Sequence, residues 1–250
     1  MFPRARSQPA GAATAATAAT PIGRRVVLGM VAFGAGGILA GARIQAALTR
    51  WLAPVFAADP TGLSALIPVA GRFRIYSVVG FLPRRKTDQY SLRVDGLVDR
   101  PLDLSYADLV AMPPTRLVRD FQCVTGWRVP KVPWTGVLLS AVLDRAGVQA
   151  QGRALKFTSF DGQYTESLSL AQGLRPDVLV AYQLEDHAVS AEHGGPVRLY
   201  VAPMYGYKSC KWLARIEVTS AVEPGYWENQ GYDVDAWVGH SNGRDDHATS

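Results

Sequence analysis

The chain has 250 residues, of which 48% are hydrophobic, and it contains 24 glycines, 16 prolines and 2 cysteines. This length suffices for one sizeable domain, and the composition excludes collagen-like, coiled-coil and disulfide-stapled folds. The net charge of +5 arises in residues 1–58, which hold six arginines and no lysine or acidic residue, whereas residues 59–250 have 20 basic and 21 acidic side chains. We therefore expect no nucleic-acid partner.

The N-terminal leader has the pattern of an export signal. Residues 1–20 are rich in alanine and threonine without periodicity, which predicts disorder. Arg24 and Arg25 precede a glycine-rich, mildly apolar run, Val26–Ala42, as in twin-arginine signals. Cleavage after Ala57 and an uncleaved membrane anchor in residues 26–42 are both open. Either outcome puts the remaining chain outside the cytoplasm, in a periplasm or at the cell surface.

The chain divides into this leader (1–58), a domain (59–223) and a polar, aromatic C-terminal tail (224–250). The domain contains short apolar stretches, separated by turn signals, that are typical of strands. In chain order, the expected extended stretches are 71–80, 90–94, 117–122, 154–160, 164–168, 178–184, 197–201 and 213–218. Asp95-Gly96 and Asp161-Gly162 are the expected turns, the second within a hairpin.

Two helices are expected among these strands. A capping box formed by Ser105 and Asp108 precedes a short helix that ends at Met112. Thr135 is expected to cap a second helix, Val137–Ala146, in which apolar residues recur at helical spacing. Because strands outnumber helices and do not alternate with them, the sequence predicts a single α+β domain with a mixed sheet.

Cys123 is the first candidate for chemistry, since it ends an expected strand and opens a glycine-containing loop. Thiolate is the natural ligand of a soft metal, and the nearby Arg119, Arg128 and Lys131 favour the thiolate. A small buried apolar cysteine is the alternative. The four histidines lack zinc-site spacing, and no hydrolase elbow, phosphate loop or dinucleotide fingerprint occurs.

Two further segments are candidate anion sites. In Tyr205–Trp212, glycine allows close approach to a ligand, and Lys208, Ser209 and Lys211 could hold phosphate oxygens. In the stretch His193-Gly-Gly-Pro-Val-Arg198, the planar guanidinium of Arg198 suits a phosphate. A solvated surface loop and an arginine at a strand edge are the respective alternatives.

These three segments, taken together in this order, resemble the sulfite-oxidase family of molybdopterin enzymes. The most similar type is the bacterial exported catalytic subunit of methionine-sulfoxide reductases, and the resemblance covers residues 73–232. It implies that Cys123 is the single protein ligand of molybdenum. It also implies a set of contacts to the molybdopterin, namely Arg74, Ser77, Val78, Thr158, His193, Arg198, Lys208, Ser209, Cys210 and Lys211.

The sequence departs from the reductase pattern at two places. It has Arg74-Ile-Tyr-Ser77 where an asparagine-led aromatic segment is expected, and His193 where the reductase has asparagine. Both departures bear on whether methionine sulfoxide is the substrate. Arg128 follows the metal ligand closely and is expected to line the substrate entrance.

The resemblance implies an α+β domain around one buried Mo-molybdopterin, catalysing two-electron oxygen-atom transfer. Reduction of a small-molecule or protein-bound S- or N-oxide is the leading hypothesis, and a sulfite-type dehydrogenase is the enzymatic alternative. Two non-enzymatic hypotheses stay open: an exported binding domain that has lost the metal, and a membrane-anchored β-rich interaction module. Neither a haem region nor a dimerisation domain is visible, so we expect a monomer with a separate electron-transfer partner, a membrane haem protein.

Overall fold

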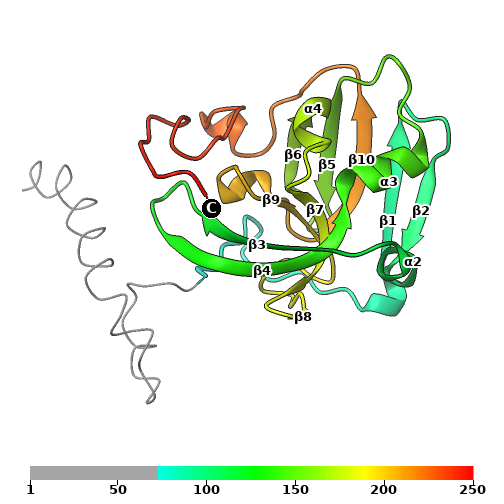
Figure 1. The fold of residues 1–250 in the computed structure, drawn as a ribbon, viewed down its shortest axis with the longest axis horizontal. Helices are drawn as coiled ribbons and strands as arrows, with labels where there is room; N and C mark the ends of the chain where they lie inside the picture. The colour runs from blue at the N-terminus through cyan, green and yellow to red at the C-terminus, as the bar shows by residue number, and fades with distance from the viewer. Residues whose placement is uncertain (1–72, 250) are drawn as a thin grey trace, which may run out of the picture. The chain divides into compact units, whose positions relative to one another are not determined.

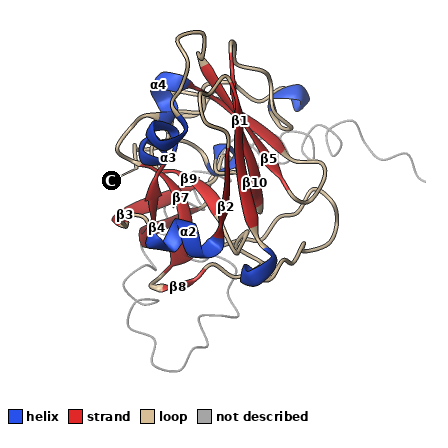
Figure 2. Ribbon diagram, turned by 90° about the vertical axis from the view of Figure 1, so that its right-hand side faces the viewer, coloured by secondary structure: helices blue, strands red, loops and turns tan. Residues whose placement is uncertain are grey.

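Two five-stranded β-sheets form the framework of residues 73–249, the part of the chain that the computed structural model describes (Figures 1 and 2). By its internal contacts the chain divides into two units, Met1–Arg50 and Trp51–Ser250. The predicted leader with its twin arginines, and the predicted boundary at residue 59, lie outside the described residues. Within residues 73–249, no helix has the length and apolar character needed to cross a membrane.

The first sheet is mixed. At its centre β1 (Ser91–Gly96) runs parallel to β10 (Leu213–Thr219), and the other neighbours pair antiparallel. Its order is β2-β1-β10-β5-β6, where β2 is Leu102–Ser105, β5 is Ala154–Ser159 and β6 is Thr165–Ser169. The hairpin expected at Asp161-Gly162 is confirmed as the β5–β6 pair. β1 ends at Gly96, whose φ of +84° is left-handed, and Val98 N donates to Gly96 O at 2.9 Å, so the chain turns at the expected Asp95-Gly96 position.

The second sheet is antiparallel and holds the strand that leads into Cys123. β3 (Thr115–Gln122) pairs with β4 (Arg128–Leu138), which pairs with β7 (Val178–Leu184). Two short strands, β8 (His187–Ala188) and β9 (Arg198–Val201), lie along the other edge of β7. The sheet therefore joins the Cys123 strand to the Arg198 strand.

Short helices connect the strands. They are α2 (Tyr106–Ala111), α3 (Leu139–Ala146), α4 (Leu170–Gly173) and the 3-10 turns η2 (Thr87–Gln89), η3 (Gly206–Lys208) and η4 (Glu228–Gln230). The predicted capping box is confirmed, because Asp108 N donates to Ser105 Oγ at 3.1 Å and Ser105 N to Asp108 Oδ2 at 2.9 Å. Strands dominate, and the few helices do not alternate with them, so the predicted α+β class is confirmed.

The alternation of side chains along β7 and β9 separates two hydrophobic cores. Val178, Val180 and Tyr182 of β7 pack into the larger core between the sheets, whereas Leu179 and Ala181 pack into a smaller core on the other face. β9 follows the same rule, since Leu199 and Val201 face the larger core and Tyr200 the smaller one. Arg198 shares the face of Tyr200, because successive strand residues point in opposite directions.

The expected start of the second helix is wrong. The chain stays in strand β4 as far as Leu138, α3 begins at Leu139, and no side chain caps it. Pro130 and Pro133 concealed this strand in the sequence, because proline removes a ladder hydrogen bond. The backbone accommodates Pro130 at an irregularity opposite Arg119–Phe121, where the pairing register shifts. Of the expected extended stretch 71–80, residues 73–80 form no strand and end in a turn.

The C-terminal segment, residues 224–249, completes the larger core. Ala236 and Val238 are buried in it, and Trp237 pairs with Met204 in an isolated bridge. Tyr207 Oη donates to the carbonyl oxygen of Asp233 at 2.7 Å. These residues therefore pack as part of the domain that carries the basic loop.

Replacing Val238 by alanine should lower the free energy of unfolding by about 2 kcal/mol, because it deletes buried methyl groups and leaves a cavity. Val238 is 3% exposed, whereas Val234 in the same segment is 43% exposed. The matched control Val234→Ala should change stability by less than about 0.5 kcal/mol. Urea unfolding measures both, and equal effects would contradict a packed C-terminal segment.

Candidate active site

Cys123 occupies a tight turn at the end of β3. Its carbonyl oxygen accepts from Gly126 N at 3.0 Å, and its own N–H donates to Trp127 O at 2.9 Å. The residue is half-buried, and its Sγ lies 3.2 Å from Thr125 Oγ1. The β3–β4 connection thus holds a partly exposed cysteine whose backbone is fixed by two hydrogen bonds.

Arg128, at the start of β4, braces this turn. Its guanidinium donates to Asp120 Oδ2 at 3.0 Å and to Gln122 Oε1 at 2.6 Å. It also donates to the carbonyl oxygen of His247. Asp120 in turn accepts from Lys131 N at 2.9 Å. This bond gives a partner to a backbone N–H at the position where the strand pairing of β4 is irregular. Arg128 is therefore engaged by neighbours on both sides, and its role at a substrate entrance stays a prediction.

Arg198 is a buried cation held by neutral groups. It is 3% exposed and donates to three carbonyl oxygens, at 2.6 Å for His193, 2.9 Å for Ser209 and 3.2 Å for Leu199. Its guanidinium also lies 5.2 Å from the ring centroid of Trp134. Burial lowers the pKa of Arg198 to about 10, so it stays charged at neutral pH. Among the described residues no carboxylate forms an ion pair with it, an arrangement suited to an anionic ligand.

Lys211 provides a second cation nearby. Its Nζ donates to the carbonyl oxygen of Tyr76 and lies 4.4 Å from the ring centroid of Trp212. Burial, with a further contribution from Arg198, lowers the pKa of Lys211 to about 8. A Cβ added at Gly194 would lie 2.5 Å from the Lys211 Cβ, so only glycine permits this approach. The glycine segment and the basic loop therefore pack directly together.

His193 lies on the aromatic side of the same group. Its ring is 4.9 Å from that of Phe73 in an edge-on arrangement. Burial first, and Arg198 second, lower the pKa of His193. The imidazole is therefore neutral at pH 7, with one ring nitrogen that donates and one that accepts a hydrogen bond.

The remaining predicted contacts differ in their surroundings. Ser209 Oγ accepts from Val201 N at 3.0 Å, and Cys210 is fully buried, which raises the pKa of its thiol. Thr158 lies in β5 opposite Thr165 and Arg215. On the irregular segment before η2, Ser77 Oγ donates to Phe81 O at 2.5 Å, Arg74 is exposed and Val78 is half-buried.

Lys208 belongs to an internal ion cluster. Its Nζ donates to Glu166 Oε1 at 2.5 Å and to Glu228 Oε1 at 2.6 Å, and all three side chains are buried. Burial raises the pKa of Glu166 well above its usual value, and the nearby Glu228 raises it further, while Lys208 lowers it. In this structure Lys208 pairs with both carboxyl groups. A contact between Lys208 and a cofactor stays a prediction.

Phe121 is the point at which the predicted segments meet. The Arg198 guanidinium lies 5.7 Å from its ring, and the Phe73 ring lies 5.2 Å from it. A Cβ at Gly206 would lie 2.4 Å from Phe121 Cζ, so the basic loop also rests on this ring. Because Cys123 follows Phe121 by two residues, the fold brings the thiol strand, the Arg198 strand and the basic loop together.

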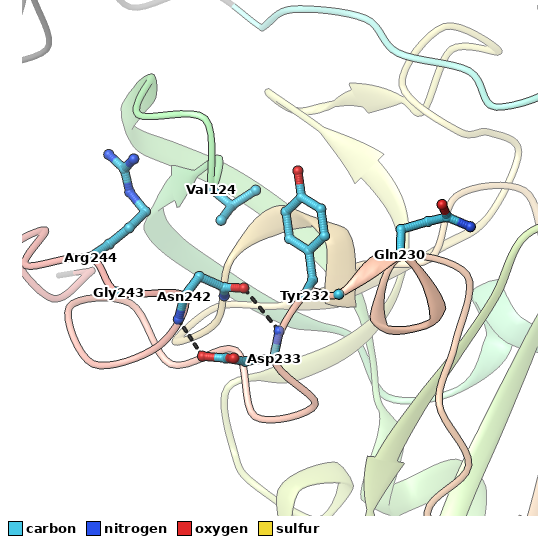
Figure 3. Close-up of a pocket in the computed structure, with 8 residues that line it drawn as sticks. Val124, Gln230, Tyr232, Asp233, Asn242, Gly243 and Arg244 are labelled. Atoms are coloured by element: carbon cyan, nitrogen blue, oxygen red, sulfur yellow. Dashed lines mark hydrogen bonds between the residues drawn. The ribbon is translucent and has the colours of Figure 1, made fainter. Parts of the chain in front are cut away.

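A cavity of about 390 Å³ adjoins the Cys123 turn (Figure 3). Val124 lines it from the turn, and its other walls are formed by residues 230–233 and 242–244 of the C-terminal segment. No sequence motif marks these residues, although the polar and aromatic composition of the segment is unlike that of a disordered end. The lining residues are Val124, Gln230, Gly231, Tyr232, Asp233, Asn242, Gly243 and Arg244.

Residues 79–227 match the sequence model of the family described as oxidoreductase molybdopterin binding domain. The chain belongs to this family. Its relatives include YuiH, an uncharacterized oxidoreductase of Bacillus subtilis that is 35% identical over 151 residues, or 60% of this chain and 76% of YuiH. The methionine-sulfoxide reductase catalytic subunit MsrP of Campylobacter jejuni is 28% identical over 159 residues, or 57% of this chain but only 53% of MsrP.

The fold has a counterpart among solved structures. The sulfane dehydrogenase SoxCD of Paracoccus pantotrophus superimposes with a TM-score of 0.53 at 22% identity, covering 61% of this chain and 46% of the SoxCD chain. This similarity shows the fold of the family. Together with the family match, it confirms the predicted membership in the sulfite-oxidase family of molybdopterin-binding oxidoreductases.

The residues present fit the cofactor that gives the family its name. Molybdopterin carries a phosphate, and the buried Arg198, held by carbonyl oxygens alone among residues 73–249, supplies the complementary charge together with Lys211. Cys123 offers a soft ligand for the metal. Within residues 73–249, no group of three or more His, Cys, Asp or Glu side chains could hold a metal.

The ion cluster predicts losses of stability of different size for two substitutions within it. Lys208→Met leaves two buried carboxyl groups without their cation and should cost about 3–5 kcal/mol of unfolding free energy. Glu166→Gln keeps the shape of the side chain and an oxygen that accepts from Lys208 Nζ, and should cost less than about 1 kcal/mol. Chemical denaturation at pH 7 distinguishes them. A Lys208→Met protein as stable as the wild type would refute the buried cluster.

Lys211 predicts a pH effect in protein produced without cofactor. Its pKa is about 8 in the folded protein, below the ordinary lysine value, so the unfolded chain binds more protons between these two values. The free energy of unfolding of the wild type should therefore rise above pH 8 relative to that of Lys211→Met. Urea titrations of both proteins at pH 7 and pH 9.5 measure this difference. A difference that does not change with pH would contradict the burial of Lys211.

Proposed function

We propose that this chain is a molybdenum oxidoreductase that holds Mo-molybdopterin through Cys123 and reduces an S- or N-oxide. The observation that supports it most is the convergence on Phe121 of the Cys123 strand and of the buried Arg198, which has no carboxylate partner within residues 73–249. One element provides a metal ligand and the other a phosphate site, as a metal-bearing anionic cofactor requires.

Each protein group has a defined task in this proposal. The Cys123 thiolate ligates the metal, while Arg198 and Lys211 donate hydrogen bonds to the cofactor phosphate. The neutral His193 provides a further polar contact beside Arg198. The bound cofactor supplies a metal that exchanges two electrons with the substrate. The protein fixes the position of the metal and excludes water from the phosphate site.

The direction of the reaction is supported by the named relatives. MsrP proteins from Campylobacter jejuni and Ralstonia nicotianae are reductases of methionine sulfoxide, at 28% and 30% identity. In the proposed reaction, the oxide takes up two electrons and two protons, its S–O or N–O bond breaks, and the reduced compound and water are released. The electrons must come from a separate donor, since the relatives are named as catalytic subunits.

The donor in this proposal is a membrane haem protein that meets a monomer of this chain outside the cytoplasm. Arg24 and Arg25 of the leader support export, because paired arginines before a weakly apolar run direct folded, cofactor-loaded proteins across a membrane. A cofactor assembled in the cytoplasm would then be carried inside the folded domain.

Cys123→Ser should abolish stoichiometric molybdenum binding, or leave the metal without its thiolate and inactive. Val234→Ala is the control, because Val234 is 43% exposed and belongs to no predicted site, so molybdenum should be retained. Elemental mass spectrometry on protein from a cofactor-producing host measures both. Folded wild-type protein without molybdenum would overturn the proposal and favour a binding domain that has lost the metal.

The reaction itself is tested by supplying loaded wild-type protein with reduced benzyl viologen and a panel of sulfoxides and N-oxides. Oxidation of the dye that depends on an oxide supports the proposed direction. Oxidation of sulfite with ferricyanide, without any oxide reduction, would assign the chain to the sulfite-type dehydrogenases instead.

A further inference from the structure

The cavity beside the Cys123 turn is formed mostly by residues outside the family match. That match ends at residue 227, whereas seven of the eight lining residues lie at positions 230–244. Only Val124 belongs to the turn itself. The C-terminal segment of this chain therefore shapes the approach to the turn that carries Cys123.

Arg244 is the cation of this cavity, and its position is fixed. Its Nε and Nη2 donate to Asp246 at 2.6 Å and 3.2 Å. Asp246 also accepts from the buried Tyr205 Oη at 2.9 Å, which ties the pair to the start of the basic loop. A Cβ at Gly126 would lie 3.0 Å from Arg244 Nη2, so the guanidinium rests against the Cys123 turn.

The guanidinium retains hydrogen-bonding capacity. Arginine has five N–H donors. The two bonds to Asp246 use two of them, and Arg244 also has a side-chain hydrogen bond with Tyr205. The side chain is 30% exposed, so its remaining donors can reach a ligand in the cavity. Val124 lines the same cavity as Arg244 and Tyr232, so the wall also includes apolar surface (Figure 3).

The lining residues include one positive and one negative side chain. These are Arg244 and Asp233, so the cavity has no net charge. Asn242 and Asp233 bond to each other, since Asp233 N donates to Asn242 Oδ1 at 2.9 Å (Figure 3). A dianion such as sulfite finds no excess positive charge here. A neutral oxide finds one strong donor for its oxygen and an apolar wall for its alkyl groups.

We propose that this cavity binds a neutral, alkyl-bearing S- or N-oxide, and that Arg244 donates to its oxygen and orients it toward the Cys123 turn. The assignment rests on the proposed function and names the substrate class and a specificity-determining residue for it. The C-terminal segment then contributes the substrate site, while the family-matching residues contribute the cofactor site.

The test uses full-length, cofactor-loaded protein, reduced benzyl viologen and methyl phenyl sulfoxide. Arg244→Gln should raise KM at least tenfold, with a smaller change in kcat and unchanged molybdenum content. Arg244→Lys, which keeps the charge but loses the planar fork, should fall between this variant and the wild type. Calorimetric titration of the oxidised enzyme with the same sulfoxide, without reductant, should show the matching rise in Kd.

Arg175→Gln is the matched control. Arg175 pairs with Asp177 through the same two-bond contact two residues apart, at 2.9 Å and 2.8 Å, and it does not line the cavity. Its exposure, 39%, is similar to that of Arg244. This variant should keep the wild-type KM and Kd, so any change specific to Arg244 reports the cavity and not the loss of a surface ion pair.

The outcomes separate the two proposals. Wild-type activity on the sulfoxide with an unchanged KM and Kd in both Arg244 variants would overturn the role of Arg244 and leave the proposed function standing. Molybdenum-loaded wild type that reduces no oxide but oxidises sulfite, with KM for sulfite raised in Arg244→Gln, would overturn both the neutral substrate and the proposed direction.

Discussion

The buried guanidinium of Arg198 is the constraint around which the candidate site is built. It is held by carbonyl oxygens from the glycine segment, its own strand and the basic loop, and it lies over Phe121 and Trp134. Carbonyl groups solvate a cation but do not neutralise it, so the described domain carries a charge in its interior that calls for an anion. Such a charge is costly in an empty domain and favourable once an anion is bound. The alternation of side chains along β9, which turns Arg198 and Tyr200 to the face opposite Leu199, puts that charge on the side of the Cys123 strand.

Much of this arrangement could be predicted from the sequence. An alternating stretch located β1, short apolar runs located β7 and β10, and the Ser105–Asp108 spacing located α2. Cys123 and Arg198 were identified by residue chemistry, and the resemblance joined them into one site. β4 was missed because its two prolines are typical of a loop, although a backbone irregularity and the Asp120 side chain accommodate the first of them. Local propensity carries no information about such a compensation.

The sequence could not resolve the roles of the charged residues, because these depend on tertiary neighbours. Lys208 and Lys211 are three residues apart in one basic loop. Lys208 forms ion pairs with Glu166 and Glu228, whereas Lys211 lies near Arg198 and has a lowered pKa. Glu228 and Arg244 come from a C-terminal stretch without periodicity, and only the fold shows that this stretch completes the core and borders the Cys123 turn. The two proposed sites therefore come from different parts of the chain. The family-matching residues form the cofactor site, and the segment after them forms most of the cavity at its edge.

The central proposal is that Cys123 is the protein ligand of molybdenum, and X-ray absorption at the molybdenum edge tests this directly. The metal environment of loaded wild-type protein should contain a protein sulfur in addition to the cofactor sulfurs, and Cys123→Ser should lose that sulfur neighbour while any metal it retains keeps the others. An unchanged sulfur shell in a folded, molybdenum-loaded Cys123→Ser variant would contradict the account.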